Sequence, residues 1–209
     1  ELSMLKTKQI VQLRCIAHVI KRGKRGKRVN LIKLGLNLIG TGNFSKVYSL
    51  RRFGLPGYVL KVGGANGFGG AYFDPGENRY KPGKDGYPAF IKMCQEHPDC
   101  ENLPKVLHHE SSPSSTMHWT VIEELGGMRN ALSHETVRRM DSYLDVLMYS
   151  TFKGTAHRDT VALLPCKLRK ALRSLHDLIS MGYNNDMHGE NFMLRGDTVV
   201  ITDPLGHAN

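Results

Sequence analysis

The spacing of apolar residues divides the chain into a helical start, a strand-rich middle and a helical end. Near the N-terminus, apolar residues recur at intervals of three and four, which predicts an amphipathic helix from Ser3 to about Ile20. Alternating apolar and polar positions predict strands over about 31–38, 45–51, 58–62, 103–108 and 117–124. Helical spacing returns over 88–96, 133–149 and 165–181. This order indicates an α+β protein with antiparallel strands.

Glycine and proline dominate residues 63–88. The stretch holds eight Gly and three Pro, a composition that predicts no regular element. We expect either a functional flap or a disordered insertion.

The charge of the chain favours acidic partners. Its 29 Lys and Arg exceed its 19 Asp and Glu, which gives a net charge of +10. Nucleic acid, an acidic protein surface or nucleotide phosphates fit this excess. Part of the charge forms one basic tract, made of Lys21, Arg22, Lys24, Arg25, Lys27 and Arg28. The tract is either a solvated linker or a docking tract; the lack of interleaved aromatic residues favours the linker.

Four cysteines without the spacing of a disulfide framework indicate a reducing, cytoplasmic setting. Cys94, His97 and Cys100 have the spacing of a partial metal site, but no second ligand pair follows, so packed thiols are favoured. The apolar runs are short and flanked by charge, which predicts no membrane span.

Three polar residues near the C-terminal end have the spacing of a phosphoryl-transfer site. Asn191 follows Asp186 by five positions, and Asp203 ends a Val/Ile run twelve residues later. In such sites the first Asp orients or deprotonates the acceptor hydroxyl, and the other two residues hold magnesium against the nucleotide phosphates. A predicted hairpin around Gly196 would bring Asn191 and Asp203 together. We expect His188 to orient Asp186 or the loop backbone, or to pack beneath the loop.

A segment upstream has the spacing of a phosphate-binding loop. Gly40, Gly42 and Ser45 follow a predicted strand, and Val47 comes two residues later. Glycine lets backbone amides approach phosphates without a Cβ clash. In the next predicted strand, Lys61 lies among apolar residues, where an ammonium is costly to bury unless it meets an anion.

The order of these motifs resembles that of the protein-kinase-like superfamily. More narrowly, the stretches GTGNFSKVYSL, YVLKVG, YPAFIKM, NDMHGENFML and VVITDPL are similar to the early serine/threonine protein kinases of T-seven-like podophages. The catalytic loop is also similar to the Asp-x-His-x-x-Asn loop of aminoglycoside and choline phosphotransferases. The sequence departs from ordinary protein kinases at Asn184-Asn185, which replace His-Arg, and at Ser45, which replaces the third glycine. No Ala-Pro-Glu motif follows Asp203 in this sequence.

The resemblance implies a bilobal protein-kinase-like fold, with an antiparallel-sheet N-lobe and a reduced helical C-lobe. The expected segments are 1–30 (helix and basic tract), 31–126 (N-lobe with hinge) and 127–209 (C-lobe with the catalytic loop and metal-binding strand). The pairing of Lys61 with Glu77 or Glu96 stays open.

The implied activity is ATP- and Mg²⁺-dependent transfer of phosphate to Ser or Thr of proteins, such as host transcription and RNA-processing proteins in the cytoplasm of an infected cell. Asp186 is the expected base, Lys61 grips the phosphates, and Asn191 and Asp203 are the metal ligands. The residues expected to bind nucleotide are Gly40, Gly42, Asn43, Ser45, Val47, Lys61, Glu123 and Leu125. Two alternatives stay open: a small-molecule phosphotransferase of the aminoglycoside or choline type, and a pseudokinase-like module that binds an acidic host partner.

Overall fold

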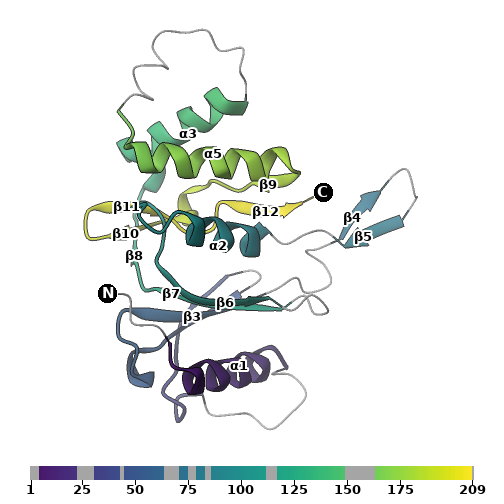
Figure 1. Ribbon diagram of the computed structural model, residues 1–209, viewed down its shortest axis with the longest axis vertical. Coiled ribbons are helices and arrows are strands. Elements are labelled where there is room, and N and C mark those ends of the chain that lie inside the picture. Colours follow the sequence, from purple (N-terminus) through teal and green to yellow (C-terminus); the bar gives the residue numbers. More distant parts are fainter. Residues whose placement is uncertain are drawn as a thin grey trace. The chain divides into compact units, whose positions relative to one another are not determined.

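The computed structural model describes residues 5–22, 31–42, 45–63, 71–74, 79–82, 86–111, 117–148 and 163–208 (Figure 1). These residues form an α+β protein with antiparallel sheets, as the sequence predicts. Contacts divide the chain into two compact units, Glu1–Ala71 with Lys105–Glu124 and Tyr72–Pro104 with Leu125–Asn209. No helix within the described ranges is long and apolar enough to cross a lipid bilayer.

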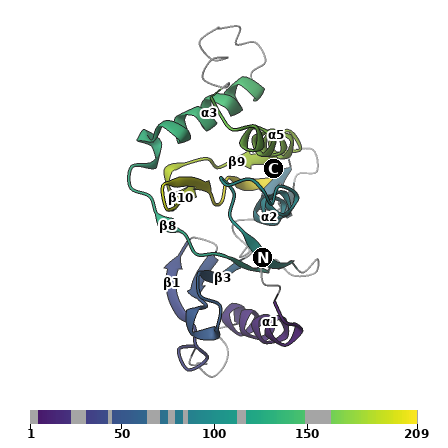
Figure 2. The same ribbon diagram turned by 60° about the vertical axis from the view of Figure 1, so that its left-hand side comes forward.

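The first unit is a five-stranded sheet with one helix on it (Figure 2). Its strands, in spatial order, are β1 (Asn37–Thr41), β2 (Ser45–Ser49), β3 (Tyr58–Gly63), β7 (His118–Glu123) and β6 (Val106–Ser111). Helix α1 (Thr7–Arg22) buries Leu13 and Ala17 in a core shared with Leu60 and Trp119 of the sheet. The predicted N-terminal helix is therefore confirmed from Thr7 onward, while Ser3 lies outside the described residues.

Residues 31–35, predicted as the start of a strand, form a turn instead. The carbonyl oxygen of Leu31 accepts hydrogen bonds from the amides of Leu34 (3.1 Å) and Leu36 (3.0 Å), which closes the turn. Gly35 has φ +82°, a left-handed conformation that glycine adopts without strain. A Cβ at Gly35 would also lie 3.2 Å from the backbone of Arg52, which follows β2 in the short helix η1 (Arg51–Phe53). The alternation of apolar and polar residues in this segment predicts a strand, although the segment forms a local turn.

The second unit packs helices against short antiparallel strands. Its helices are α2 (Gly86–Glu96), α3 (Glu135–Met148) and α5 (Cys166–Ser180), with the short turns η2 (Ala131–Ser133) and η3 (Gly189–Asn191). Helix α5 contacts both α2 and α3 (Figure 2). It buries Leu168, Leu172 and Leu175. Strand β9 (Tyr183–Asn185) pairs with β12 (Leu205–Ala208). Strand β10 (Phe192–Arg195) pairs with β11 (Thr198–Ile201) and with β8 (Gly126–Gly127).

The stretch 63–88, predicted to hold no regular element, contains a two-stranded sheet of β4 (Ala71–Asp74) and β5 (Arg79–Pro82). Tyr and Phe at positions 72, 73 and 80 favour strands, and this preference outweighs the many Gly and Pro nearby. Helix α2 begins at Gly86, two residues before its predicted start at Pro88. Proline is tolerated there because first-turn amides have no partner within the helix.

Residues 72–104 group with the second unit, whereas the sequence prediction placed them in segment 31–126. The reason is that α2 packs against β12 and α5. The contact with β12 is close at Gly86, where a Cβ would lie 2.7 Å from the Cβ of Leu205 and closer still to the carbonyl oxygen of Gly206. Only a residue without a side chain fits this position, so Gly86 sets how near α2 lies to β12.

Candidate active site

The residues with phosphoryl-transfer spacing come together in the second unit. Gly182, with φ +101°, follows α5 and starts the turn into β9, which leads directly to Asp186. The predicted hairpin is confirmed, because β10 and β11 pair with Phe192 opposite Ile201. Asn191 and Thr202 are the next residues outward from that last pair. Asp203 is therefore one residue beyond the position that faces Asn191.

Asn191 and Asp186 are joined directly. The side-chain Nδ2 of Asn191 donates to the backbone oxygen of Asp186 at 2.7 Å and to its carboxylate Oδ2 at 3.3 Å. Because the NH₂ group is directed at Asp186, the amide Oδ1 of Asn191 is the atom available to a cation. The Asp186 side chain is 50% exposed, so the carboxylate is accessible from solvent.

Backbone hydrogen bonds hold the Asp203 segment against this loop. The amide of Thr202 donates to the carbonyl of Asn191 at 2.9 Å, and the amide of Asp186 donates to the carbonyl of Pro204 at 2.8 Å. These two bonds flank Asp203 in sequence, which places it beside both loop residues. Asp203 itself is partly buried. All three predicted residues of this half of the site are thus brought together.

His188 contacts both ends of the loop. Its Nδ1 accepts a hydrogen bond from the amide of Glu190 at 3.3 Å and so caps η3. Its Nε2 lies 3.7 Å from Oδ2 of Asp186. The hypothesis that His188 packs beneath the loop is wrong, because its side chain is 49% exposed.

Two residues that the sequence did not single out brace the hairpin. Buried Asn102 donates from Nδ2 to the carbonyl of Val199 at 2.8 Å, and its own carbonyl accepts from the amide of Ile201 at 2.9 Å. Arg195 donates to the carbonyls of Glu101 at 2.6 Å and Leu103 at 2.9 Å. No sequence signal marks these contacts, since the partners are more than 90 positions apart.

The predicted phosphate-binding segment lies in the first unit. Gly40 is in β1, Ser45 and Val47 are in β2, and the amide of Gly42 donates to the carbonyl of Ser45 at 2.9 Å. Asn43 lies outside the described residues. The segment is therefore a β1–β2 connection, as the motif predicts.

Lys61 projects from the face of the sheet opposite to α1. On β3 it pairs with Val47 of β2 and Thr120 of β7, and paired residues of antiparallel strands share a face. Its neighbours Leu60 and Val62 point the other way, into the core with α1. Lys61 is partly buried.

The remaining predicted nucleotide residues lie at a strand end. The amide of Glu123, the last residue of β7, donates to the carbonyl of Lys105 at 2.9 Å, and its carboxylate accepts from the amide of Lys105 at 3.1 Å. Leu125 comes two residues later and belongs to the second unit.

The two candidate partners of Lys61 are Glu96 and Glu77. Glu96 lies 3.9 Å from Nζ of Lys92, one turn earlier in α2. Glu77 lies outside the described residues.

The spaced cysteines behave as packed thiols. Cys94 and Cys100 are buried, and burial raises the pKa of both thiols. His97 forms a hydrogen bond through Nε2 with Oγ of Ser174 at 2.8 Å. In the part of the chain that the structure describes, no three His, Cys, Asp or Glu side chains are grouped so as to hold a metal.

The donor atoms of the loop fit magnesium better than a transition metal. Magnesium prefers hard oxygen ligands and takes one or two protein carboxylates, while water and substrate phosphates complete its shell. Asp203 supplies a carboxylate and Asn191 an amide oxygen. This small oxygen set is consistent with a magnesium–nucleotide site.

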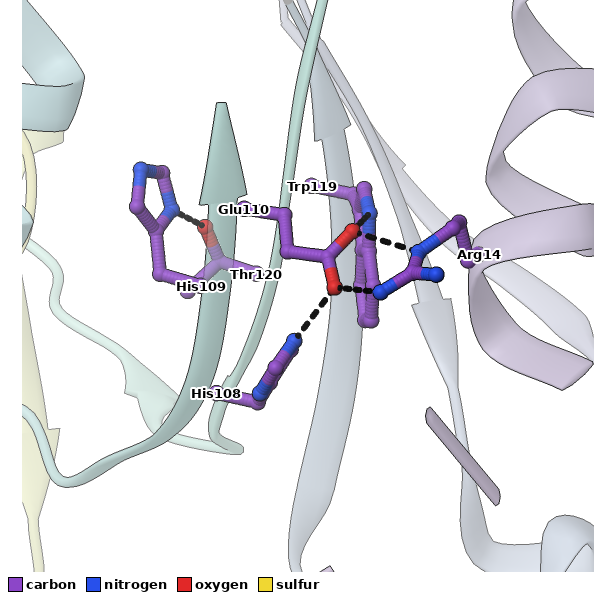
Figure 3. Close-up of polar contacts among 6 residues, drawn as sticks. All are labelled: Arg14, His108, His109, Glu110, Trp119 and Thr120. Atoms are coloured by element: carbon purple, nitrogen blue, oxygen red, sulfur yellow. Dashed lines mark hydrogen bonds and ion pairs between the residues drawn. The ribbon is translucent and has the colours of Figure 1, made fainter. Parts of the chain in front are cut away.

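A second polar cluster lies in the first unit around Glu110 (Figure 3). Its carboxylate accepts from Nε of Arg14 at 2.8 Å and from Nε1 of Trp119 at 3.1 Å, and Nε2 of His108 lies 3.1 Å away. The hydrogen bonds from Arg14 are the main reason that the pKa of Glu110 falls to about 2. The positive charge of Arg14 balances the negative charge of Glu110. This ion pair joins α1 to the sheet.

A pocket of about 470 Å³ adjoins this cluster. Its lining residues are His18, His109, Glu110, Ser111, Met117 and Trp119. His109 forms a hydrogen bond with Thr120 at 2.8 Å, away from Glu110 (Figure 3). None of the motifs found in the sequence contributes to this pocket.

The basic tract is described only where it begins. Lys21 and Arg22 end α1, whereas Lys24, Arg25, Lys27 and Arg28 lie outside the described residues.

No protein-family model matches the chain, and no curated protein matches it.

Proposed function

We propose that the protein is an ATP- and Mg²⁺-dependent kinase that phosphorylates Ser or Thr of proteins. The observation that carries the proposal is the joining of Asp186, Asn191 and the Asp203 segment by direct hydrogen bonds. Two of these residues carry carboxylates and the third carries an amide, which are the groups that a phosphoryl-transfer site of this spacing uses. The motif order supports a bilobal kinase-like arrangement with the Lys61 sheet as N-lobe.

The residues divide the reaction between them. The acceptor hydroxyl oxygen bonds to the γ-phosphorus while the bond from that phosphorus to the ADP oxygen breaks. Asp186 orients the hydroxyl and accepts its proton. Asn191 and Asp203 would hold magnesium, which would neutralise charge on the phosphates. Lys61 and the Gly40–Gly42 segment bind the phosphates. Most of the rate gain comes from positioning and charge stabilisation.

The acceptor is a protein in this proposal, and the resemblance to phage kinases supports host transcription and RNA-processing proteins as substrates. The basic tract fits an acidic surface on such substrates. The Asp-x-His spacing, which resembles the loop of aminoglycoside and choline phosphotransferases, favours a small-molecule acceptor as the second candidate.

Transfer of radiolabelled γ-phosphate tests the proposal. Purified protein is incubated with labelled ATP and Mg²⁺, with protein acceptors and small alcohols in parallel. We expect label on protein Ser or Thr, and its loss in Asp186→Asn. Asp177→Asn is the matched control, because that carboxylate is 76% exposed on α5. Label on small alcohols alone would favour the second candidate, and no label anywhere would favour a binding module.

A further inference from the structure

We propose that His188 is a positioning residue that uses its two ring nitrogens for two tasks: Nε2 orients the Asp186 carboxylate, and Nδ1 holds the turn that carries Asn191. The inference rests on the proposed kinase function. It extends that function to a residue that touches neither phosphate nor magnesium in the scheme above.

The hydrogen bond at Nδ1 fixes the form of the ring. Because Nδ1 accepts from the amide of Glu190, the hydrogen of the neutral imidazole is on Nε2. That N–H lies on the side of Asp186, with Nε2 at 3.7 Å from Oδ2. Contacts of this kind are often long in an enzyme without substrate and shorten in the reactive complex.

The ring and the backbone of His188 act on the same two residues. Its amide donates to the carbonyl of Asp186 at 2.9 Å, and its carbonyl accepts from the amide of Asn191 at 2.9 Å. The Nδ1 cap satisfies the amide of Glu190, which has no partner within so short a turn. His188 therefore forms hydrogen bonds with both the proposed base, Asp186, and the proposed metal ligand, Asn191.

The orientation of Asp186 follows from these contacts. Among the described residues, Nδ2 of Asn191 donates to Oδ2 of the Asp186 carboxylate, and Nε2 of His188 lies 3.7 Å from the same oxygen. Oδ1 is then the oxygen presented to the acceptor hydroxyl. Without His188, one of the two groups that keep the carboxylate from rotating is lost.

Substitutions separate the two tasks. Asparagine places its amide oxygen near the position of Nδ1, so His188→Asn keeps the cap but does not reach Asp186. Glutamine places its amide nitrogen near the position of Nε2, so His188→Gln keeps a donor toward Asp186 but loses the cap. His188→Ala loses both. His134→Ala is the control, since Nδ1 of His134 accepts from the amide of Thr136 at 3.2 Å in the same type of cap, directly before α3 and outside the 186–191 loop.

Steady-state kinetics with magnesium-ATP read out the two tasks. We expect His188→Ala to lower kcat roughly 10- to 100-fold, the usual effect of losing a group that orients a functional residue. His188→Asn should keep the KM for ATP near that of the wild type with a low kcat. His188→Gln should recover most of kcat but show a raised KM. His134→Ala should lower the melting temperature and leave kcat unchanged.

A second measurement does not depend on activity. Long-range ¹H–¹⁵N correlation of the imidazole nitrogens reports which one carries the hydrogen in the neutral ring, and we expect the Nε2–H tautomer for His188. The opposite form, wild-type kinetics in His188→Ala, or equal losses in the Asn, Gln and Ala variants would each overturn the assignment of His188 alone. A wild-type protein that transfers no phosphate would overturn the kinase proposal and the role of His188 together.

Discussion

The amide nitrogen of Thr202 lies 2.9 Å from the carbonyl oxygen of Asn191, directly past the end of the β10–β11 hairpin. This bond continues the pairing of the two strands by one step, although neither residue is part of a strand. Its consequence is that Asp203 cannot move away from Asn191 without opening the hairpin end. The two proposed metal ligands are held together by the backbone before any ion binds.

Removing Asp203 should abolish stabilisation by nucleotide. Magnesium-ATP at about 100 times its Kd should stabilise the wild type by about 2.7 kcal/mol. Asp203→Ala should show almost none of this stabilisation, since it lacks the carboxylate proposed to hold the ion. Thermal unfolding with and without nucleotide measures the effect. Asp197→Ala, in the exposed turn of the same hairpin, is the control and should respond as the wild type does. An equal response in Asp203→Ala would refute the metal assignment.

Asp186→Asn should fold normally and lose transfer by roughly 10²–10⁴-fold, the usual contribution of an acid–base group. The side chain is half exposed and keeps a hydrogen-bonding amide, so the free energy of unfolding should change little. Initial rates of phosphate transfer, with circular dichroism as the folding check, measure both quantities. Wild-type rates in this variant would mean that Asp186 is not the base.

Glu110→Gln should destabilise the first unit in a pH-dependent way. The pKa of Glu110 is lowered from 4.5 to about 2, mainly by hydrogen bonds from Arg14. The ionised carboxylate therefore stabilises the fold above pH 4.5, and this contribution is lost as the pH falls toward 2. Urea unfolding from pH 7 to pH 2 measures the free energy of unfolding of both proteins. The values for the wild type and the variant should converge at low pH.

The control for Glu110 is Glu96→Gln. Glu96 pairs with Lys92 at 3.9 Å and is 57% exposed, and such exposed pairs contribute little. The free energy of unfolding of Glu96→Gln should stay close to that of the wild type across the pH range. If the free energy of unfolding of Glu110→Gln differed from that of the wild type by the same amount at every pH, the ion pair would not be the cause of the destabilisation.

Gly86→Ala should destabilise the second unit by about 1–3 kcal/mol, the usual cost of inserting a methyl into a packed contact. The added Cβ would meet Leu205 at 2.7 Å and the carbonyl oxygen of Gly206. Because these are largely backbone atoms, they cannot rotate away. Gly127→Ala, with nothing within 4 Å of its Cβ, should change stability by less than about 0.5 kcal/mol. Chemical denaturation of both variants decides the comparison.

Local patterns predicted much of the fold, and contacts distant in sequence account for the rest. The alternation around Lys61 predicted β3, and the turn at Gly196 predicted the hairpin that places Asn191. Strands β9 and β12 were not predicted, since each is only three or four residues long and its partner lies some twenty residues away. Asn102 was missed for a similar reason, because a buried asparagine looks like any loop residue until its partner Val199 is known.

The absent side chain at Gly86 also determines how mutational data on this protein should be read. Gly86 is one hundred positions before Asp186 in sequence, yet it makes room for the backbone that follows Pro204. The amide of Asp186 donates a hydrogen bond to the carbonyl of Pro204. A scan scored on phosphate transfer alone would rank Gly86 with Asp186 and Asn191. A scan scored on protein abundance would rank it with Leu172 and the other core residues. Only the difference between the two scans separates a residue proposed to take part in the chemistry from one that leaves space for it.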